Sequence, residues 1–215
     1  IAADGGLDHT RQLGIVPDLV VGDFDSLEGR PPRTDVRTIA LPALKDDPDM
    51  LSALKVGWSA GCREFHVYGG LGGRIDHTIS GIQLMALLAR HGASGYLYGD
   101  GLIVTAITDG RLSFPAHPVP EDGRMVSAFS HSDVSLGVNE PGLKYELKDG
   151  TLTNTVVQGV SNEFRDGVDA AISVEHGTLI VTFPIEVALP QVSRFHEFGG
   201  DIGELDTAVS KLLVR

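Results

Sequence analysis

The sequence predicts an α/β protein: an N-terminal, mostly parallel α/β domain followed by a C-terminal antiparallel β-sandwich. Two observations predict this division. In the first half, short apolar runs alternate with longer segments of helical periodicity, which is typical of strands alternating with helices. In the second half, the apolar segments shorten and turn-forming pairs recur about every eight to twelve residues, as in small antiparallel sheets. We assign residues 1–109 to the first domain, 110–190 to the second and 191–215 to a tail.

The first half has the elements of a strand–helix–strand layer. Strands are expected at 18–22, 36–41, 64–68, 96–98 and 102–106. Helices are expected at 48–61 and 76–91, where apolar residues recur at helical spacing and Gly92 ends the second helix. Ile1-Ala2-Ala3 resembles the end of a buried strand, so we expect a further strand to precede residue 1 in the native chain.

The second half has the pattern of an antiparallel sheet. Strands are expected at 124–129, 156–160, 171–174 and 178–183. Turns are expected at the Asp-Gly and His-Gly pairs 109–110, 122–123, 149–150, 166–167 and 176–177. Pro184 and Pro190 end this pattern, and residues 204–213 are compatible with a terminal helix.

Composition limits the classes of partner. The formal net charge is −12, so nucleic acid and anionic membranes are not expected partners. No apolar run approaches the roughly 18 residues of a membrane span. The single cysteine, Cys62, cannot form an internal disulfide, which fits a reducing compartment, and we expect a cytoplasmic protein.

Two acids follow the apolar run 19–21. Asp23 and Asp25 are two positions apart, so in an extended segment both carboxylates face the same way and can reach one cation. Mg²⁺ prefers hard oxygen ligands of this kind. Like charges at a buried strand end repel unless a cation compensates them, which favours a metal site over a solvated acidic loop.

Two further clusters allow alternative interpretations. In Ala3-Asp4-Gly5-Gly6, the glycines would let backbone N–H groups approach an anion, or would simply form a tight turn. The segment 45–49 (Lys-Asp-Asp-Pro-Asp) has three acids at a helix start, where acids are also favoured for purely structural reasons. Lys45 could meet a phosphate or offset the acids.

The glycine-rich segment 69–78 is the most specific element. Four glycines in five residues follow a strand and precede Arg74, Asp76, His77 and Thr78 at a helix start. A flexible backbone, a helix N-terminus and an arginine together suit a polyphosphate. The segment has neither the Walker sequence nor the dinucleotide-binding glycine spacing. The alternative is a flexible hinge, and His77 is as compatible with capping as with a base.

At this point the motifs resemble a known family. Ala-Asp-Gly-Gly at 3–6, the run at 14–26 that ends in Asp-Phe-Asp-Ser, Lys-Asp-Asp-Pro-Asp at 45–49 and Gly-Gly-Arg-Ile-Asp-His-Thr at 72–78 resemble the thiamine pyrophosphokinases, in that order. Segments 142–145 and 159–164 match as well, so the resemblance covers residues 1–183. Two departures are Pro48, where the family usually has Thr or Ser, and Met50, which replaces a frequent Thr.

The resemblance implies an α/β nucleotide-binding domain followed by a β-sandwich, and with them an activity and an assembly. It implies transfer of the pyrophosphoryl group of ATP to the hydroxyl of thiamine, giving thiamine diphosphate and AMP, with Mg²⁺ as cofactor. It implies a homodimer in which thiamine lies between the α/β domain of one subunit and the sandwich of the other.

The resemblance also implies roles for particular residues. The metal ligands would be Asp23, Asp25 and Asp49. The catalytic group would be these three with Asp46, our choice for any general base. The ATP site would be Asp4, Gly5, Gly6, Gly72, Gly73, Arg74, Asp76, His77 and Thr78. The thiamine site would be Asp46, Ser161 and Asn162.

Two other functions compete. Asp23-Phe24-Asp25 has the nucleophile spacing of haloacid-dehalogenase phosphatases, with Lys45 as the candidate lysine. Leu27 does not fit that family, and the segment 69–78 has no place in it. The other alternative is an inactive nucleotide-sensing homologue, to which the Pro48 substitution would be relevant.

Overall fold

The computed structural model describes residues 1–29, 31–120 and 123–209. The described chain forms two compact units. We call residues 1–62 with the tail from Ile202 the N-terminal unit, and residues 63–201 the C-terminal unit. Both contain helices and strands, so the predicted mixed α/β fold is confirmed. Among the described residues, no helix has the length and apolar character needed to cross a membrane.

The N-terminal unit is a small parallel sheet with two helices. Strands β1 (Ala2–Ala3), β2 (Leu19–Gly22) and β3 (Arg37–Ala40) are parallel and lie in that order. The helices are α1 (Gly6–Gln12) and α2 (Asp49–Ser59). All of β2 is buried, and its alternate residues enter different apolar clusters, Val20 with Leu7 and Val21 with Leu41. Because the strands are parallel, their carboxyl ends lie at one edge of the sheet.

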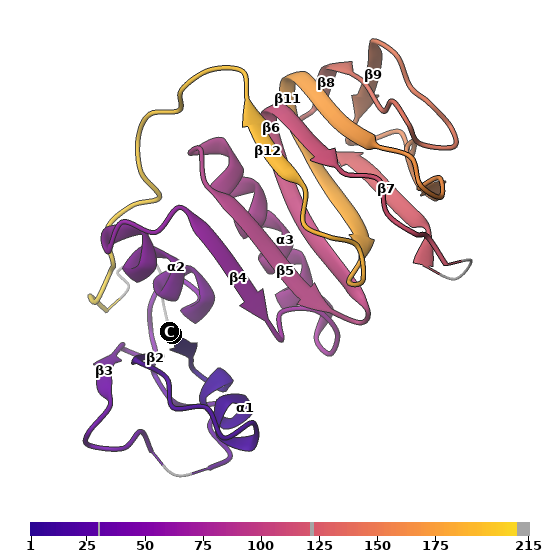
Figure 1. Ribbon diagram of the computed structural model, residues 1–215. Helices are drawn as coiled ribbons and strands as arrows, with labels where there is room; N and C mark the ends of the chain where they lie inside the picture. The colour runs from indigo at the N-terminus through magenta and orange to yellow at the C-terminus, as the bar shows by residue number, and fades with distance from the viewer. Residues whose placement is uncertain (30, 121–122, 210–215) are drawn as a thin grey trace. The chain divides into compact units, whose positions relative to one another are not determined.

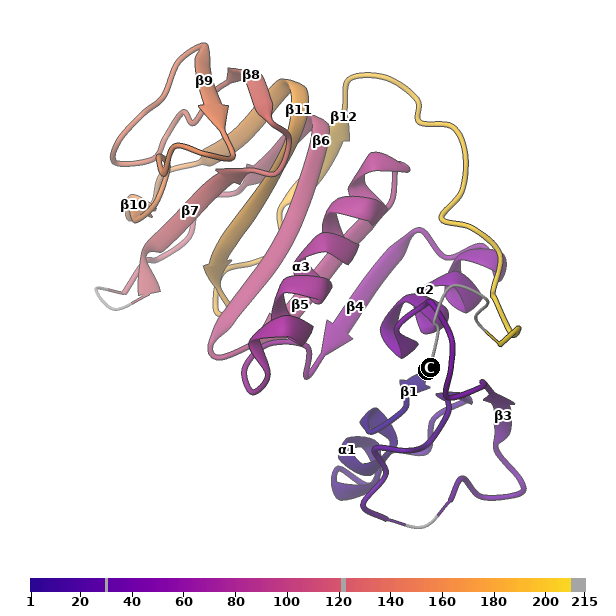
Figure 2. The ribbon, with the colours of Figure 1, turned by 180° about the vertical axis from the view of Figure 1, so that it is seen from behind.

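The C-terminal unit begins with a second strand–helix–strand segment. Strands β4 (Glu64–Tyr68) and β5 (Ser94–Gly99) are parallel and are joined by α3 (Ile75–Arg90). The next strand, β6 (Leu102–Phe114), is antiparallel to β5. Helix α3 packs against β5, β6 and β11 and covers one face of the sheet, as the view from behind in Figure 2 shows.

The remaining strands extend this sheet to nine. They are β7 (Met125–Ser130), β8 (Val134–Val138), β9 (Gly150–Thr153), β10 (Asn162–Glu163), β11 (Ala170–Pro184) and β12 (Gln191–Arg194). The main order is β10-β7-β11-β6-β5-β4, with β12 paired to β6 and β8 paired to β11 and β9 (Figure 1). The core of this unit includes Phe114, which contacts Phe164 and Phe183 edge to face.

The turns predicted at 109–110 and 176–177 are wrong, because β6 and β11 run through both positions. Gly110 pairs with Val174 and Thr108 with Thr178, so Asp109 lies opposite residues 175–177 in an irregularity of the ladder. Asp109 has a φ of 40°, and its Oδ1 accepts a hydrogen bond of 2.8 Å from Gly177 N. The two dipeptides therefore mark facing irregularities rather than strand ends.

Two other expectations differ from the structure. Residues 156–160 were predicted as a strand but lie in the loop between β9 and β10. Val156 and Val157 are 53% and 84% exposed, so these β-prone side chains find no core to join. In the tail, Gln191–Arg194 is a strand and residues 195–209 contain no helix. Residues 210–213 of the expected terminal helix lie outside the described part of the chain.

Candidate active site

Three aspartates converge at the carboxyl edge of the N-terminal sheet. Asp4 follows β1, while Asp23 and Asp25 follow β2. Each offers a carboxylate oxygen, and these oxygens all lie within 4.8 Å of one another. Oδ1 of Asp4 is buried and has no hydrogen-bond partner among the described residues. A buried carboxylate oxygen without a donor is what a divalent cation would satisfy, so the three acids fit a metal site.

The backbone around these acids has unusual conformations. Asp4 and Phe24 have φ angles of 42° and 65°, in the left-handed region that residues with a Cβ rarely adopt. Asp4 N donates a hydrogen bond of 2.8 Å to Val21 O, which brings the β1 end against β2. At Gly22, a Cβ atom would lie 3.0 Å from Asp4 Cα. The two strand ends therefore approach closely only with glycine at that position.

A buried lysine joins a fourth acid to the group. Lys45 Nζ lies 2.6 Å from Asp23 Oδ2 and 3.2 Å from Asp49 Oδ1, and its side chain is 6% exposed. Burial opposes the ionisation of Asp23, but the hydrogen bond and charge of Lys45 together with the hydrogen bonds from Asp25 outweigh it, so the pKa of Asp23 is lowered. Burial likewise opposes the charge on Lys45, but its two carboxylate partners raise its pKa. Lys45 is thus a charged counterion within the group.

Asp49 is in a different electrostatic environment. Burial raises its pKa, and the charges of Asp23 and Asp4 add to this effect against the opposing influence of Lys45. The effect of Asp23 and Asp4 on the pKa of Asp49 indicates that Asp49 belongs electrostatically to the same group. Its carboxylate is not one of the three whose oxygens lie within 4.8 Å of one another.

The other acids of the segment 45–49 differ from these. Asp47 Oδ2 accepts a hydrogen bond of 2.5 Å from Lys55 Nζ, so its carboxylate is already paired. Asp46 is exposed. Pro48 is the N-cap of α2, and its carbonyl accepts a hydrogen bond from Ser52 N. At this position a proline supplies the extended backbone of an N-cap but no capping side chain.

Gly5 and Gly6 form the tight turn into α1. Gly5 is the N-cap, and Leu7 N donates a hydrogen bond of 3.0 Å to Asp4 O. A Cβ atom on Gly5 would lie 3.7 Å from Ser26 O, in ordinary contact, so this turn lies next to the loop that carries Asp23 and Asp25.

The glycine-rich segment lies in the C-terminal unit, between β4 and α3. Gly69, Gly72 and Gly73 have φ angles of 76°, 80° and 65°, which explains why glycine occupies these positions. Arg74 is the N-cap of α3, and its guanidinium pairs with Asp76 through two hydrogen bonds of 3.2 and 2.5 Å. This pair lowers the pKa of Asp76 to about 2.

The rest of this segment has a capping arrangement. Asp76 Oδ1 also accepts a hydrogen bond of 3.0 Å from His77 N. The side chains of Arg74, Asp76 and His77 are exposed, and Thr78 is partly buried. Gly72 and Gly73 are exposed, and they are followed by an arginine whose charge is already shared with a carboxylate.

Ser161 and Asn162 have contrasting environments. Ser161 is exposed and has a φ of 60°, and its N–H donates to Ser127 Oγ at 3.0 Å. Asn162 is 5% exposed, and its side-chain oxygen accepts hydrogen bonds from the backbone of Tyr145 and Glu163. The side-chain oxygen of Asn162 therefore uses both of its lone pairs within the protein. These hydrogen bonds link segments 142–145 and 161–163.

Asn162 is also linked to a buried acid. Its Nδ2 donates to Tyr145 O at 2.8 Å and to Glu140 Oε2 at 2.9 Å. Glu140 is 3% exposed and its Oε1 is buried without a hydrogen-bond partner among the described residues. Burial raises the pKa of Glu140, against the hydrogen bond from Asn162 that favours the charged form.

The first part of the chain is similar to one known protein family. Residues 1–97 match the family described as thiamin pyrophosphokinase, catalytic domain. This part of the chain is therefore similar to that catalytic domain. The match runs from β1 into β5 and includes the acid group and the glycine-rich segment. It confirms the resemblance to thiamine pyrophosphokinase that the motifs indicated.

Solved thiamine pyrophosphokinase structures share the fold. The protein from Bacillus subtilis aligns with a TM-score of 0.72 at 22% identity, covering 86% of this chain and 86% of that chain. The protein from Geobacillus thermodenitrificans aligns with a TM-score of 0.71 at 22% identity and the same coverage. The protein from Candida albicans gives 0.70 at 14% identity, with 85% of this chain and 80% of that chain covered. The sequence matches none of the curated proteins with which it was compared.

The structure adds two contacts to the sequence-based assignments. Asp4 was assigned to ATP, but its carboxylate lies with those of Asp23 and Asp25. Lys45 was left open between phosphate and acids, and it pairs with two acids. Only the order of the parallel strands could have indicated the position of the Asp4 carboxylate, because that order places the ends of β1 and β2 side by side.

Proposed function

We propose that the protein transfers the pyrophosphoryl group of ATP to the hydroxyl of thiamine, giving thiamine diphosphate and AMP. The observation that carries this proposal is the match of residues 1–97 to the thiamin pyrophosphokinase catalytic domain, with the acid group at its strand ends. In the reaction, a bond forms between the thiamine hydroxyl oxygen and the β-phosphorus of ATP. The bond between that phosphorus and the α–β bridging oxygen breaks, and AMP leaves.

Asp23, Asp25 and Asp49 are proposed to hold Mg²⁺, with Asp4 as an additional ligand that the geometry supports. When bound, Mg²⁺ would neutralise charge on the polyphosphate. Lys45 would keep Asp23 and Asp49 from repelling each other, since its Nζ lies within 3.2 Å of both carboxylates. Asp46, which is exposed beside this group, is proposed to accept the proton of the thiamine hydroxyl.

The glycine-rich segment is proposed to bind ATP phosphates, and a role in ATP binding is proposed separately for residues 4–6. Its three left-handed glycines allow backbone N–H groups to approach an anion, and Arg74 stands at the start of α3. Asp76, His77 and Thr78 complete the proposed ATP site. Arg74 would donate to phosphate at the expense of its present contacts with Asp76.

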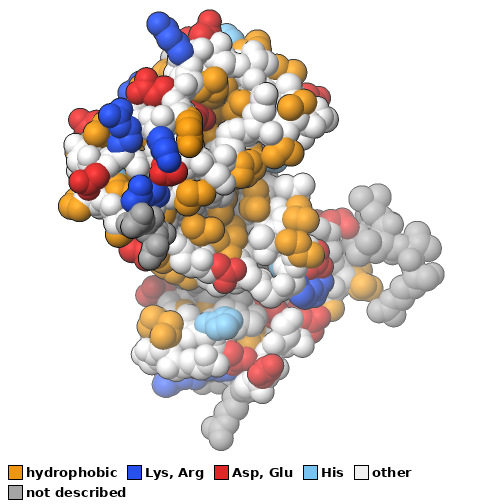
Figure 3. All heavy atoms as spheres, turned by 90° about the vertical axis from the view of Figure 1, so that its right-hand side faces the viewer, with side chains coloured by type: hydrophobic (Ala, Val, Ile, Leu, Met, Phe, Trp, Pro, Cys, Tyr) orange, Lys and Arg blue, Asp and Glu red, His pale blue; other side chains and the backbone are white. Residues whose placement is uncertain are grey.

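Thiamine is proposed to contact Ser161, with Asn162 holding the loop that presents it. We propose that residues 1–109 serve ATP and metal, and that residues 110–190 form a sandwich that serves thiamine. We also propose a cytoplasmic homodimer with the site shared between subunits. Exposed apolar side chains support an interface, and those within 134–160 are Val134, Leu136, Tyr145, Val156, Val157 and Val160. Figure 3 shows hydrophobic side chains at the surface on one side of the protein.

The test is product analysis by mass spectrometry after incubation with ATP, Mg²⁺ and thiamine. We expect AMP and thiamine diphosphate in equal amounts, and no AMP without thiamine. Inorganic phosphate released in the absence of thiamine would instead indicate a phosphatase. ATP binding without thiamine-dependent turnover would indicate an inactive nucleotide-binding homologue.

A further inference from the structure

We propose that Asp8 and Arg11 of helix α1 form a clamp that positions the metal-binding acids, although neither side chain belongs to the acid group. The clamp fastens the segment that follows Asp25 to the helix that follows Asp4. This inference rests on the proposed function, because it concerns the same group of carboxylates.

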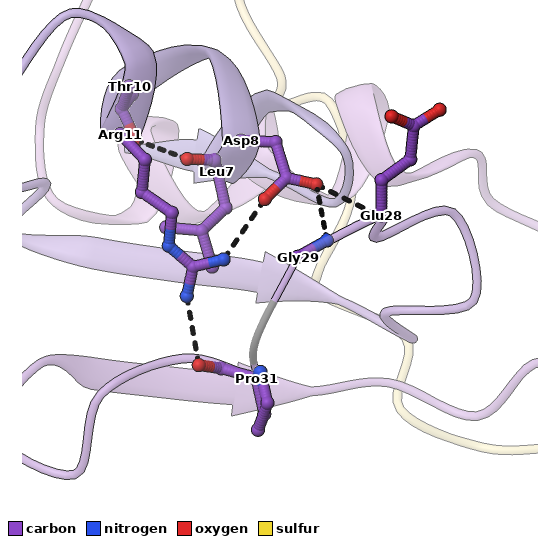
Figure 4. A network of polar contacts seen from close by, with 7 residues as sticks. All are labelled: Leu7, Asp8, Thr10, Arg11, Glu28, Gly29 and Pro31. Carbon is purple, nitrogen blue, oxygen red and sulfur yellow. Dashed lines mark hydrogen bonds and ion pairs between the residues drawn. The ribbon is translucent and has the colours of Figure 1, made fainter.

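The clamp consists of four hydrogen bonds, shown in Figure 4. Asp8 Oδ2 accepts from Glu28 N at 2.9 Å and from Gly29 N at 3.3 Å. Asp8 Oδ1 accepts from Arg11 Nη1 at 3.0 Å, and Arg11 Nη2 donates to Pro31 O at 2.9 Å. Asp8 and Arg11 are three positions apart on one helix, so their mutual contact orients both toward the loop.

The clamp joins chain segments that lie close in sequence to the metal-binding acids. Asp8 lies four residues after Asp4, and Glu28 lies three residues after Asp25. The acid group exists only if the β1 end and the β2 end stay close together, and the clamp joins the two chain segments that leave those ends. Asp23 and Asp25 repel each other and Asp4, which would spread the loops without such a link.

The sequence of the loop is matched to the clamp. A Cβ atom on Gly29 would lie 2.6 Å from Asp8 Oδ1 and 3.1 Å from Arg11 Nη1. Glycine at 29 therefore permits the close approach that the hydrogen bonds require. Leu27, between the acids and the clamp, packs with Ala2, Leu7 and Val20, which holds the same loop from its apolar side.

The experiment measures Mn²⁺ affinity of the substrate-free full chain by electron paramagnetic resonance, since Mn²⁺ accepts the carboxylate ligands of Mg²⁺. Asp8→Ala is expected to raise the Kd for Mn²⁺ about tenfold, the scale for removing a group that orients metal ligands. Asp35→Ala is the matched control. It breaks another Asp–Arg pair of the same unit, Arg33–Asp35, whose side chains are 63–70% exposed and make no contact with the acids. Its Kd is expected to be unchanged.

Arg11→Gln is the second variant, in case Asp8→Ala fails to fold, and it should also raise the Kd several-fold because it loses both Asp8 and Pro31. A Kd within twofold of wild type in every folded clamp variant overturns the clamp. If Asp23→Asn abolishes Mn²⁺ binding in that case, the proposed metal site stands and only the clamp fails. If wild type and Asp23→Asn bind Mn²⁺ equally, the metal site and the clamp both fail.

Discussion

Charge balance at the acid group depends on individual residues. Four aspartates lie near one another, and within the group the positive charge is supplied by Lys45, which contacts Asp23 and Asp49. One ammonium leaves an excess of negative charge on the group. A divalent cation bound there would therefore relieve repulsion as well as take part in the reaction.

Asp23→Asn and Asp25→Asn are each expected to lower kcat for AMP formation at least about a hundredfold, the scale for losing one key electrostatic group. The substitutions keep the side-chain volume but remove a negative oxygen from the group. The control is Asp35→Asn, an exposed aspartate of the same unit, which should leave kcat unchanged. A near-normal rate in either of the first two variants would exclude that residue from the reaction.

Phe24 is expected to show backbone strain. Its φ is 65°, and its ring packs against the cluster that contains Leu7 and Val20. Phe24→Ala removes the packing and keeps the strain, whereas Phe24→Gly removes both. We expect Phe24→Gly to be more stable than Phe24→Ala by about 0.5–1 kcal/mol, because the left-handed penalty exceeds the extra chain entropy of glycine. Urea unfolding of both variants measures this difference, and an equal or lower stability of the glycine variant would contradict it.

Glu140 is expected to make stability depend on pH. Its folded-state pKa is raised by burial, so the folded state binds the proton more tightly than the unfolded state does. The free energy of unfolding should therefore fall as pH rises from the unfolded pKa of about 4.5 to the raised folded value. Glu140→Gln removes this titration and keeps the side chain's shape.

The measurement is Tm against pH for wild type and Glu140→Gln. The difference in Tm should move in favour of the variant as pH rises above the unfolded pKa of the glutamate. Parallel curves for the two proteins would mean that Glu140 does not titrate with folding.

Among the elements, the connection that precedes β10 depends on one glycine. Gly159 has a φ of 78°, its carbonyl accepts a hydrogen bond from Ala128 N, and a Cβ atom there would lie 2.4 Å from Ala128 O. Gly159→Ala is expected to destabilise the fold by about 2–5 kcal/mol, from the left-handed strain together with the clash.

Gly167 is the matched control for this prediction. It has a φ of 66°, but a Cβ atom there would meet nothing within 4 Å. Gly167→Ala should cost only the backbone strain, about 1–2 kcal/mol. Chemical denaturation compares the two variants, and equal losses would show that the clash at Gly159 is relieved by movement of β7.

Elements with strong periodicity could be predicted from the sequence. The strand at 64–68 and the helices at 48–61 and 76–91 correspond to β4, α2 and α3, because a short β-prone run or an apolar helix face is a local signal. The strand at 156–160 and the turns at 109–110 and 176–177 were wrong. In those places the outcome depends on whether distant chain supplies a pairing partner, which a local pattern does not contain.

The candidate site could be predicted only in part for the same reason. The spacing of Asp23 and Asp25 indicated a cation site, since both acids come from one strand end. The carboxylate of Asp4 joins them through the parallel pairing of β1 and β2, and the contacts of Lys45 depend on chain that returns from β3. The hydrogen bonds from Asn162 to Glu140 and Tyr145 join residues up to 22 positions apart, and no local sequence motif predicts them.

At the scale of the whole molecule, the proposed shared site predicts complementation between subunits. Asp23→Asn disables the metal side and Ser161→Arg blocks the proposed thiamine side. If each site takes one side from each subunit, a heterodimer of the two variants contains one intact site. Unfolding and refolding an equal mixture should restore about a quarter of wild-type activity, because half of the dimers are mixed and each has one of two sites.

Each variant alone serves as the control and should remain inactive after the same treatment. Light scattering should give a dimer mass, twice the 22.8 kDa of the chain. A dimer whose mixture stays inactive would mean that each subunit holds its own complete site.

The irregular ladder of β6 and β11 has a practical consequence for anyone dividing the gene. Strand β6 continues from Leu102 to Phe114 through Asp109, and it pairs with β5 before that residue and with β12 after it. A gene fragment that stops at codon 109 would encode a truncated β6, and it would separate residues 102–108 from residues 178–184 of β11, with which they pair. A junction in the loop between α2 and β4 cuts no ladder, but the first fragment then lacks the tail from Ile202 that belongs to the N-terminal unit.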